Sequence, residues 1–483
     1  MTNLLAMKFG GTSMGSAERI RAAAAICAEQ RKNRPIVVIV SAMSKTTDLL
    51  LDTLRSAEAG RSMELESNLK RLEARHVEAC RGLLPEPACS SAICEVGTMV
   101  GEFSRIAHGM LILGERPPKS VDEAAAVGER LSAMILSAYL NATGTQATAV
   151  NASEIVVTDD EFGNATPLLD MTAERAFEKL VPLLESGIVP VMTGFNGATV
   201  DGRPTTLGRG GSDYSASILA SVLDATELWI WSDVDGIMTA DPRLVKEAAV
   251  LDEVTYSEAA ELAYNGAKVL HPRTLAPLME KEIPVWSKNS FNLAAPGTRI
   301  VSKTTANLRG PRAVTSMPDV ALVTVNTARS SVNPTAMMGR ALDALARAGS
   351  EVLTFTSSSY RQSFCFLLRK DELPSAMEAL QAEFGLELAH GYLEPVDVDT
   401  EVGLLAVVGE GMQGTPGLAG RIFTAISREN VNIIAIAQGS SELTIAIVVN
   451  RSGLEKAVHA IHTECGLAQL AGIKPSTQRL PTV

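Results

Sequence analysis

Aromatic residues and positive charge are scarce in this sequence, and each shortage argues against a class of binding partner. Phe, Trp and Tyr make up 4% of the 483 residues, so a surface on which nucleobases stack is not expected. Acidic residues outnumber basic ones, 55 to 43, which gives a formal net charge of −12. Such a chain repels nucleic acid and anionic membranes unless it has a strong basic patch. We therefore expect no nucleic-acid partner and no membrane partner.

Cysteine pairs and long apolar runs are also lacking. The six cysteines show no Cys-x-x-Cys spacing, which fits buried thiols in a reducing compartment better than disulfides or zinc ligands. No run of about 20 apolar residues is present, as a membrane span would require. The first residues reach Lys8 and a glycine pair at once, unlike a signal peptide. These features predict a cytoplasmic protein.

A glycine-rich stretch, Thr205–Tyr214, is the most informative part of the chain. It contains three glycines and Arg209, and it leads into Ser215–Leu223, which we expect to be helical. A glycine loop before a helix binds anions, because free N–H groups and the positive end of the helix dipole point outward. Asp213 would repel such an anion unless a metal ion or a lysine lay between them. This favours phosphoryl transfer, although a tight turn with Asp213 at the favourable dipole end remains the alternative.

The N-terminal segment predicts a β-α-β unit with a lysine at its ligand-binding edge. Leu4–Phe9 and Pro35–Val40 are apolar strands, and Ala17–Gln30 has the helical period. Parallel strands need such a crossover, and open α/β sheets bind ligands at the carboxyl ends of their strands. Lys8 lies one residue before the end of the first strand. We therefore expect Lys8 and the mid-chain glycine loop to meet at one edge of a sheet.

Polar residues follow two further strands, and each group has two interpretations. Ser41–Asp48 offers hydroxyl groups that could bind substrate or cap the next helix. Ser232–Gly236 follows the strand Glu227–Trp231 and could contact a magnesium nucleotide or form an Asp-Gly turn. Glu129, on an alanine-rich helix, would most simply be solvated.

The composition becomes polar near residues 304–312, where we place a domain boundary. After it, strand and helix patterns follow the order β-α-β-β-α twice, with a repeat of about 80 residues. This order predicts two ferredoxin-like βαββαβ modules behind an α/β domain with an open, mainly parallel sheet sandwiched by helices. Neither module contains a nucleophile–base pair or a metal-ligand set, so we expect both to bind ligands or to associate.

Four motifs, in this order, resemble the aspartate kinase family. They are Lys8–Ser13, Thr206–Tyr214, Trp231–Gly236 and Gly266–Pro272. The C-terminal repeat is similar to the paired ACT regulatory domains of that family, and the order also resembles the kinase part of bifunctional aspartate kinase–homoserine dehydrogenases. The resemblance implies an amino acid kinase catalytic domain over residues 1–303 and ACT domains over 318–398 and 403–475.

The resemblance further implies the reaction and its partners. Members transfer the γ-phosphate of ATP, with Mg²⁺, to the β-carboxylate of L-aspartate, which gives 4-phospho-L-aspartate and ADP at the start of aspartate-family amino acid biosynthesis. An amino-acid effector at the ACT domains and a homodimer or dimer of dimers are expected. The substrate carboxylate is already ionised at neutral pH, so no general base is needed.

Site residues are carried over only where this sequence matches the motifs. Met238 stands where relatives often have tyrosine, and Ser232 where threonine is usual, which implies altered adenine packing. Leu353 stands where lysine-inhibited relatives carry an acid, which implies weak or absent lysine inhibition by that route. No Mg²⁺ ligand is identified. The implied residues are catalytic Lys8 and Asp213; substrate-binding Ser41, Thr47, Glu129, Arg209, Gly210, Gly211 and Ser212; nucleotide-binding Lys8, Gly10, Gly11, Ser232, Asp233, Met238, Arg243, Lys268 and Val269; and effector-binding Asn432 and Gln438.

Two rival hypotheses remain open from the sequence. The first is a kinase of the same fold that acts on another amino-acid carboxylate or on a carbamate. The second is an amino-acid sensor without catalytic activity, which would work through its ACT repeats. The presence of Lys8, Arg209 and Asp213 argues against the second hypothesis.

Overall fold

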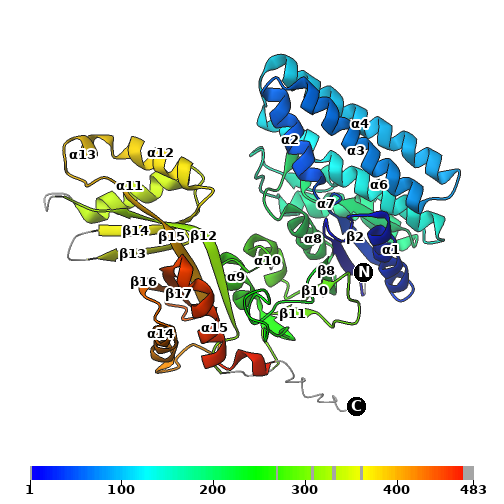
Figure 1. Ribbon diagram of the computed structural model, residues 1–483. Coiled ribbons are helices and arrows are strands. Elements are labelled where there is room, and N and C mark those ends of the chain that lie inside the picture. The colour runs from blue at the N-terminus through cyan, green and yellow to red at the C-terminus, as the bar shows by residue number, and fades with distance from the viewer. Residues whose placement is uncertain (1–2, 268–269, 306–308, 329–332, 359–362, 471–483) are drawn as a thin grey trace, which may run out of the picture. The chain divides into compact units, whose positions relative to one another are not determined.

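The structure is a computed structural model that describes residues 3–267, 270–305, 309–328, 333–358 and 363–470 (Figure 1). The chain divides into two compact units. The first comprises Met1–Ile237, Asp252–Tyr256 and Leu270–Lys303, and the second comprises Met238–Leu251, Ser257–Val269 and Thr304–Val483. Among the described residues, no helix combines the length and the apolar character needed to cross a membrane.

An eight-stranded sheet forms the centre of the first unit. Its neighbouring strands are parallel, as the β-α-β pattern predicts, except for β10 and β11, which are antiparallel. The two central strands β1 and β2 are buried along their whole length, because helices cover both faces of the sheet. In spatial order the strands are β3 (Ala147–Val150), β5 (Val189–Thr193), β2 (Ile36–Val40), β1 (Leu5–Phe9), β8 (Glu227–Ser232), β10 (Val285–Asn289), β11 (Thr298–Val301) and β9 (Glu253–Thr255).

Helices form two layers around this sheet (Figure 1). One layer packs on the apolar side chains Leu5, Met7 and Phe9 of β1, and contains α1 (Ala17–Arg31), α3 (Ser62–Leu83), α4 (Ala88–Leu113) and α6 (Val127–Ala142). The helix α2 (Thr46–Glu58) packs against α3 and α4. On the other side, α8 (Gly211–Val222) contacts β1, β2 and β8, and packs against α7 (Leu169–Glu185) and α10 (Pro272–Met279).

Two helical stretches are each divided in the structure. The segment before Pro118 forms α3 and α4, which are separated by a loop with two prolines. The helix expected around Glu129 is α5 (Pro118–Ala125) followed by α6, with the interruption at Ala126. A small sheet of β4 (Val157–Thr158), β6 (Asn196–Thr199) and β7 (Pro204–Thr206) contains the hairpin that the Asp201-Gly202 turn predicts.

The second unit contains one six-stranded sheet rather than two separate ones. All of its neighbouring strands are antiparallel, and the long central pair joins the two repeats. Helices α11 (Pro334–Arg347) and α12 (Leu373–Glu383) belong to the first repeat, and α14 (Leu418–Arg428) and α15 (Leu454–Glu464) to the second. The strands, in spatial order, are β13 (Thr354–Ser358), β14 (Ser363–Arg369), β12 (Ala313–Val325), β15 (Asp397–Val408), β17 (Thr444–Asn450) and β16 (Ile433–Gln438).

Two segments that precede residue 304 in sequence also belong to this unit. Thr239 lies 3.0 Å from His462 Nε2 through its hydroxyl group, and its carbonyl oxygen accepts a hydrogen bond from the Val314 amide at 2.8 Å. The helix α9 (Tyr256–Tyr264) contributes Glu261, which accepts a hydrogen bond from the Thr444 hydroxyl at 2.7 Å. The chain on either side of β9 is therefore anchored to the second repeat, and the domain limits at 303, 318–398 and 403–475 stay predictions.

Candidate functional site

Strand β1 places a lysine opposite an aspartate at the carboxyl edge of the sheet. Successive side chains of a strand point to opposite faces, so Lys8 points away from the apolar layer that holds Met7 and Phe9. Its Nζ lies 2.5 Å from Asp213 Oδ1, in the first turn of α8. The Lys8 side chain is 9% exposed and that of Asp213 is 22% exposed. The structure thus joins two residues 205 positions apart in sequence.

Glycines allow the chain to pass closely around this pair. Gly10 donates its amide hydrogen to the Trp231 carbonyl group at 3.0 Å, at the end of β8. A Cβ atom on Gly10 would lie 3.3 Å from that carbonyl oxygen and 3.5 Å from Lys8 Nζ. A side chain at this position would therefore cover the lysine and close the space at the strand ends.

The glycine loop adopts the geometry expected of an anion site. Gly208 and Gly210 have φ angles of +74° and +72°, a conformation that favours glycine. Helix α8 begins at Gly211, four residues before the predicted start, so Ser212 and Asp213 lie in its first turn. The first N–H groups of a helix have no partner within it. Arg209 is exposed and has no ion pair or hydrogen bond within the described residues.

Glu129 is buried instead of solvated, which the sequence pattern does not indicate. Its side chain accepts a hydrogen bond from the Ala42 amide at 3.2 Å through Oε1. Its other oxygen, Oε2, is buried and has no hydrogen-bond partner within the described residues. Burial raises its pKa from 4.5 to about 8, and the hydrogen bond from Ala42 and the charge on Lys8 oppose this rise. An unpartnered oxygen in such a site can accept a hydrogen bond from a ligand's ammonium group.

This pKa gives a first prediction about stability. Between pH 4.5 and about 8 the folded chain holds a proton on Glu129 that the unfolded chain has released. The free energy of unfolding therefore contains a contribution that is fully present below pH 4.5 and is lost as the pH rises through 8. We expect the melting temperature of the ligand-free protein to fall more between pH 6 and 8.5 than that of Glu129→Gln, by a few degrees. Parallel pH curves in thermal melts would contradict this.

Hydroxyl and amide groups connect the carboxyl ends of three neighbouring strands. Ser13, which follows the glycine pair, lies 2.7 Å from the Ser290 hydroxyl. Ser290 in turn donates a hydrogen bond to the Ser232 carbonyl at 3.0 Å. Asp235 accepts hydrogen bonds from the side-chain amides of Asn289 and Asn292 at 2.7 and 3.1 Å. These contacts fix the loop after β8, and neither Ser13 nor Ser290 is among the site residues that the resemblance implies.

The family of this chain follows from comparisons with known proteins. A sequence model of the amino acid kinase family matches residues 3–289, and one of an ACT domain matches residues 405–465. Aspartokinase 1 of Arabidopsis thaliana, a chloroplastic protein, is 32% identical over 94% of this chain and 79% of its own length. The chain belongs to the aspartokinase family. Its fold is accordingly the amino acid kinase fold followed by ACT domains.

Solved aspartokinase structures are similar over nearly the whole chain. Escherichia coli aspartokinase III in complex with aspartate and ADP has a TM-score of 0.82 at 30% identity, over 96% of this chain and 99% of the other. The Clostridium acetobutylicum aspartate kinase has a TM-score of 0.75 at 26% identity, over 95% and 100%. Bifunctional aspartokinase/homoserine dehydrogenase 1 of Arabidopsis thaliana is 35% identical over 96% of this chain. The chain spans 51% of that protein's length.

The remaining predicted nucleotide residues of this aspartokinase-family chain fall in three different parts of the sequence, and their role stays a prediction. Ser232 is the last residue of β8, and Asp233, which directly follows it, is exposed. Met238 and Arg243 belong to the second unit, and the guanidinium of Arg243 lies 2.5 Å from the Asp241 carboxylate. Lys268 and Val269 lie outside the described residues.

Two further predicted substrate residues, Ser41 and Thr47, lie just after β2 and at the start of α2. Ser41 donates its amide hydrogen to the Phe9 carbonyl at 3.0 Å, next to β1. Thr47 is half-buried in the first turn of α2. Within the described part of the chain, no group of three or more His, Cys, Asp and Glu side chains is arranged to hold a metal ion.

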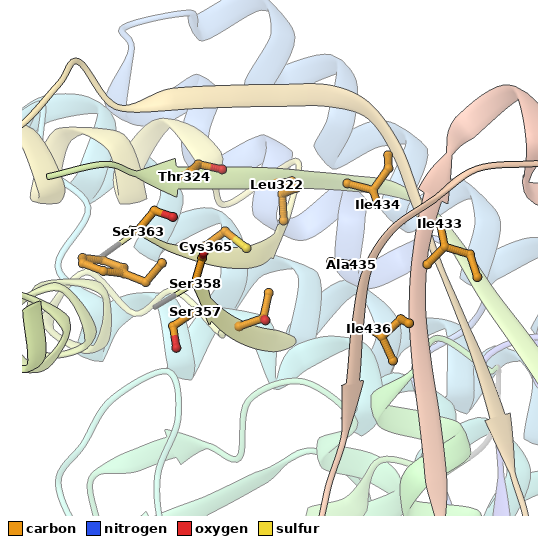
Figure 2. Close-up of a pocket in the computed structure, with 12 residues that line it drawn as sticks. Leu322, Thr324, Ser357, Ser358, Ser363, Cys365, Ile433, Ile434, Ala435 and Ile436 are labelled. Atoms are coloured by element: carbon orange, nitrogen blue, oxygen red, sulfur yellow. The ribbon is translucent and has the colours of Figure 1, made fainter. Parts of the chain in front are cut away.

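A pocket of about 380 Å³ lies in the ACT region, between the outer strands β13 and β16 (Figure 2). Its walls combine hydroxyl groups of β13 and β14 with apolar side chains of β16. Asn432 and Gln438, the predicted effector residues, do not line it. Both are exposed, and they flank the stretch of β16 that does. The lining residues are Leu322, Thr324, Thr356, Ser357, Ser358, Ser363, Phe364, Cys365, Ile433, Ile434, Ala435 and Ile436.

Proposed function

We propose that this chain is an aspartate kinase, which transfers the γ-phosphate of ATP to the β-carboxylate of L-aspartate. The observation that carries the proposal is the Lys8–Asp213 ion pair in the first turn of α8, beside the glycine loop. The complex of the E. coli relative with aspartate and ADP supports the choice of substrates. The products are 4-phospho-L-aspartate and ADP.

The residues around Lys8 account for the handling of the phosphate groups. The Lys8 ammonium and the N-terminal end of α8 offset the negative charge that builds up when two anions react. Asp213 holds the Lys8 side chain in place through the 2.5 Å contact. Mg²⁺, when bound to ATP, neutralises phosphate charge, and the carboxylates at this edge that suit its preference for oxygen ligands are Asp213 and Asp233. Few protein ligands are needed, because Mg²⁺ keeps waters and phosphate oxygens.

Arg209 and Glu129 account for recognition of the amino acid. The exposed guanidinium of Arg209 suits the α-carboxylate, with which it forms two parallel hydrogen bonds. Glu129 Oε2 suits the ammonium group, which would satisfy its missing hydrogen bond. The side-chain carboxylate of aspartate is then directed to the γ-phosphate, and holding the two groups in line lowers the barrier to transfer.

A hydroxamate assay with ATP and aspartate tests the proposal directly, because hydroxylamine traps the acyl phosphate. We expect product with aspartate and much less with glutamate or N-acetylglutamate. ADP release that is greatest with one of the other acceptors would replace aspartate as the substrate. Amino-acid binding without any ATP turnover would show a sensor instead of an enzyme.

The proposal includes regulation by an amino acid at the ACT domains, and Leu353 gives a prediction about it. Leu353 is half-buried, packs in an apolar cluster and donates its amide hydrogen to the Leu367 carbonyl at 2.9 Å. A leucine offers no charge to an ammonium group, so we expect lysine to change the initial rate by less than about twofold at millimolar concentration. Threonine and methionine, titrated in parallel, serve as comparison effectors. Strong inhibition that Leu353→Ala removes would contradict the prediction.

The broader setting is part of the same proposal. The reaction would start aspartate-family amino acid biosynthesis in the cytoplasm, and the chain would act as a homodimer or a dimer of dimers. The aspartokinase relatives support the pathway. Size-exclusion chromatography with light scattering measures the oligomeric state.

A further inference from the structure

Asp122, on helix α5, is a buried acid that the sequence gives no reason to select. Its side chain is 2% exposed and accepts three hydrogen bonds, each 2.8 Å long. Oδ2 accepts from the amides of Gly163 and Thr206, and Oδ1 accepts from the Thr206 hydroxyl. All three donors are neutral, and burial raises the pKa of the carboxyl group. Within the described part of the chain this carboxylate has no counter-ion, and a buried charge without one is costly to the fold, which points to a role beyond packing.

The two hydrogen bonds from Thr206 join the two segments that carry the proposed substrate clamp, Glu129 and Arg209. Asp122 precedes Glu129 by seven residues. Asp122 lies in α5, and Glu129 lies in the first turn of α6. Thr206 ends β7 and precedes Arg209 by three residues. The segments are distant in sequence, so the Asp122 carboxylate is a direct connection between them.

The third donor, the Gly163 amide, connects Asp122 to a segment that contacts the glycine loop. The residue after Gly163 is Asn164, which lies close to Gly208, the first glycine of the glycine loop. The Asn164 Oδ1 atom would be 2.6 Å from a Cβ atom on Gly208. Asn164 in turn accepts a hydrogen bond from the Arg273 guanidinium at 2.5 Å. The carboxylate of Asp122 therefore fixes the base of the glycine loop from two sides.

We infer that Asp122 is a positioning residue that sets the separation between Glu129 and Arg209, and through it the affinity for the amino-acid acceptor. This inference rests on the proposed aspartate kinase function. Within the described residues Arg209 has no side-chain partner, so the reach of its guanidinium depends on where its backbone is held. The phosphate-binding contact between Lys8 and Asp213 does not involve Asp122. A change at Asp122 should thus affect aspartate more than ATP.

Thr206→Val is the sharpest test, because it removes one hydrogen bond to Asp122 and preserves the shape of the side chain. We expect the KM for aspartate to rise about tenfold, with the KM for ATP within twofold of the parent value. Thr206→Ser, which keeps the hydroxyl group, should restore the parent value. Thr205→Val is the matched control: it removes a buried hydroxyl contact on the same strand, 2.7 Å to the Thr158 hydroxyl, that does not reach Asp122.

A double-mutant cycle distinguishes a positioning role of Asp122 from a general loss of structure. If Asp122 acts through Arg209, the effect of Thr206→Val on the KM for aspartate should disappear in an Arg209→Ala background. Full additivity, or equal effects of Thr206→Val and Thr205→Val, would overturn the inference. A parent protein that does not phosphorylate aspartate would instead refute the proposed function. Asp122→Asn provides a second variant, with a larger expected rise in the same KM.

Discussion

Replacing Lys8 by alanine is expected to lower kcat for aspartate phosphorylation by about a thousandfold or more, since the ammonium offsets charge that develops in the transition state. Lys8 is 8% exposed and its Nζ lies 2.5 Å from Asp213, so its ammonium group is held in place within the site. Replacing Lys8 leaves the apolar contacts of Leu5, Met7 and Phe9, on the other face of β1, unchanged. The variant should therefore fold. Initial rates at saturating ATP and aspartate measure the loss.

The control for this experiment is a lysine on the same unit and outside the site. Lys70, exposed on α3, serves this purpose, and Lys70→Ala should leave kcat unchanged. Asp213→Asn should also be slow, because it removes the charge that holds Lys8. Residues that act together give non-additive losses, so the double variant should be little slower than Lys8→Ala. Turnover of Lys8→Ala near the parent value would contradict the assignment.

Local patterns explain why most of the fold could be predicted. The apolar runs of β1 and β2 and the glycine pair between β1 and α1 each depend on neighbouring residues. Strands β9 and β11 were not predicted, because each is short and finds its partner at the far edge of the sheet. Two ferredoxin-like C-terminal modules were expected, but not that β12 and β15 would pair and join them in one sheet. Such pairing between distant strands leaves no signal in a local window.

The site was predictable only in part, for a related reason. Lys8, Arg209 and Asp213 stand beside glycines, and glycines near strand ends and helix starts indicate ligand contact from sequence alone. The burial of Glu129 depends on how α6 packs near Ala42, and the role of Asp122 depends on Thr206 and Gly163. Neither acid lies in a motif with a recognisable spacing. Their environments arise from tertiary packing, so resemblance alone indicated Glu129 and nothing indicated Asp122.

Arg209→Ala should raise the KM for aspartate about a hundredfold, because the α-carboxylate loses a charge-assisted pair of hydrogen bonds. Arg209 is exposed and unpaired within the described residues, so its removal leaves no buried group without a partner and should not destabilise the fold. The KM for ATP should stay within about twofold of the parent value, since the phosphate groups are held by Lys8 and the start of α8. A steady-state analysis with each substrate varied separately distinguishes the two constants.

The identity of the cation at position 209 provides the decisive comparison. Arg209→Lys keeps the charge and loses the planar fork, so it should recover only part of the affinity. Arg203 is a matched control, because it is an exposed arginine on the neighbouring hairpin, and Arg203→Ala should behave as the parent does. If Arg209→Ala and Arg203→Ala raise the KM equally, a general loss of positive charge is responsible. If Arg209→Lys equals the parent, a point charge suffices and the two-pronged contact with the α-carboxylate is wrong.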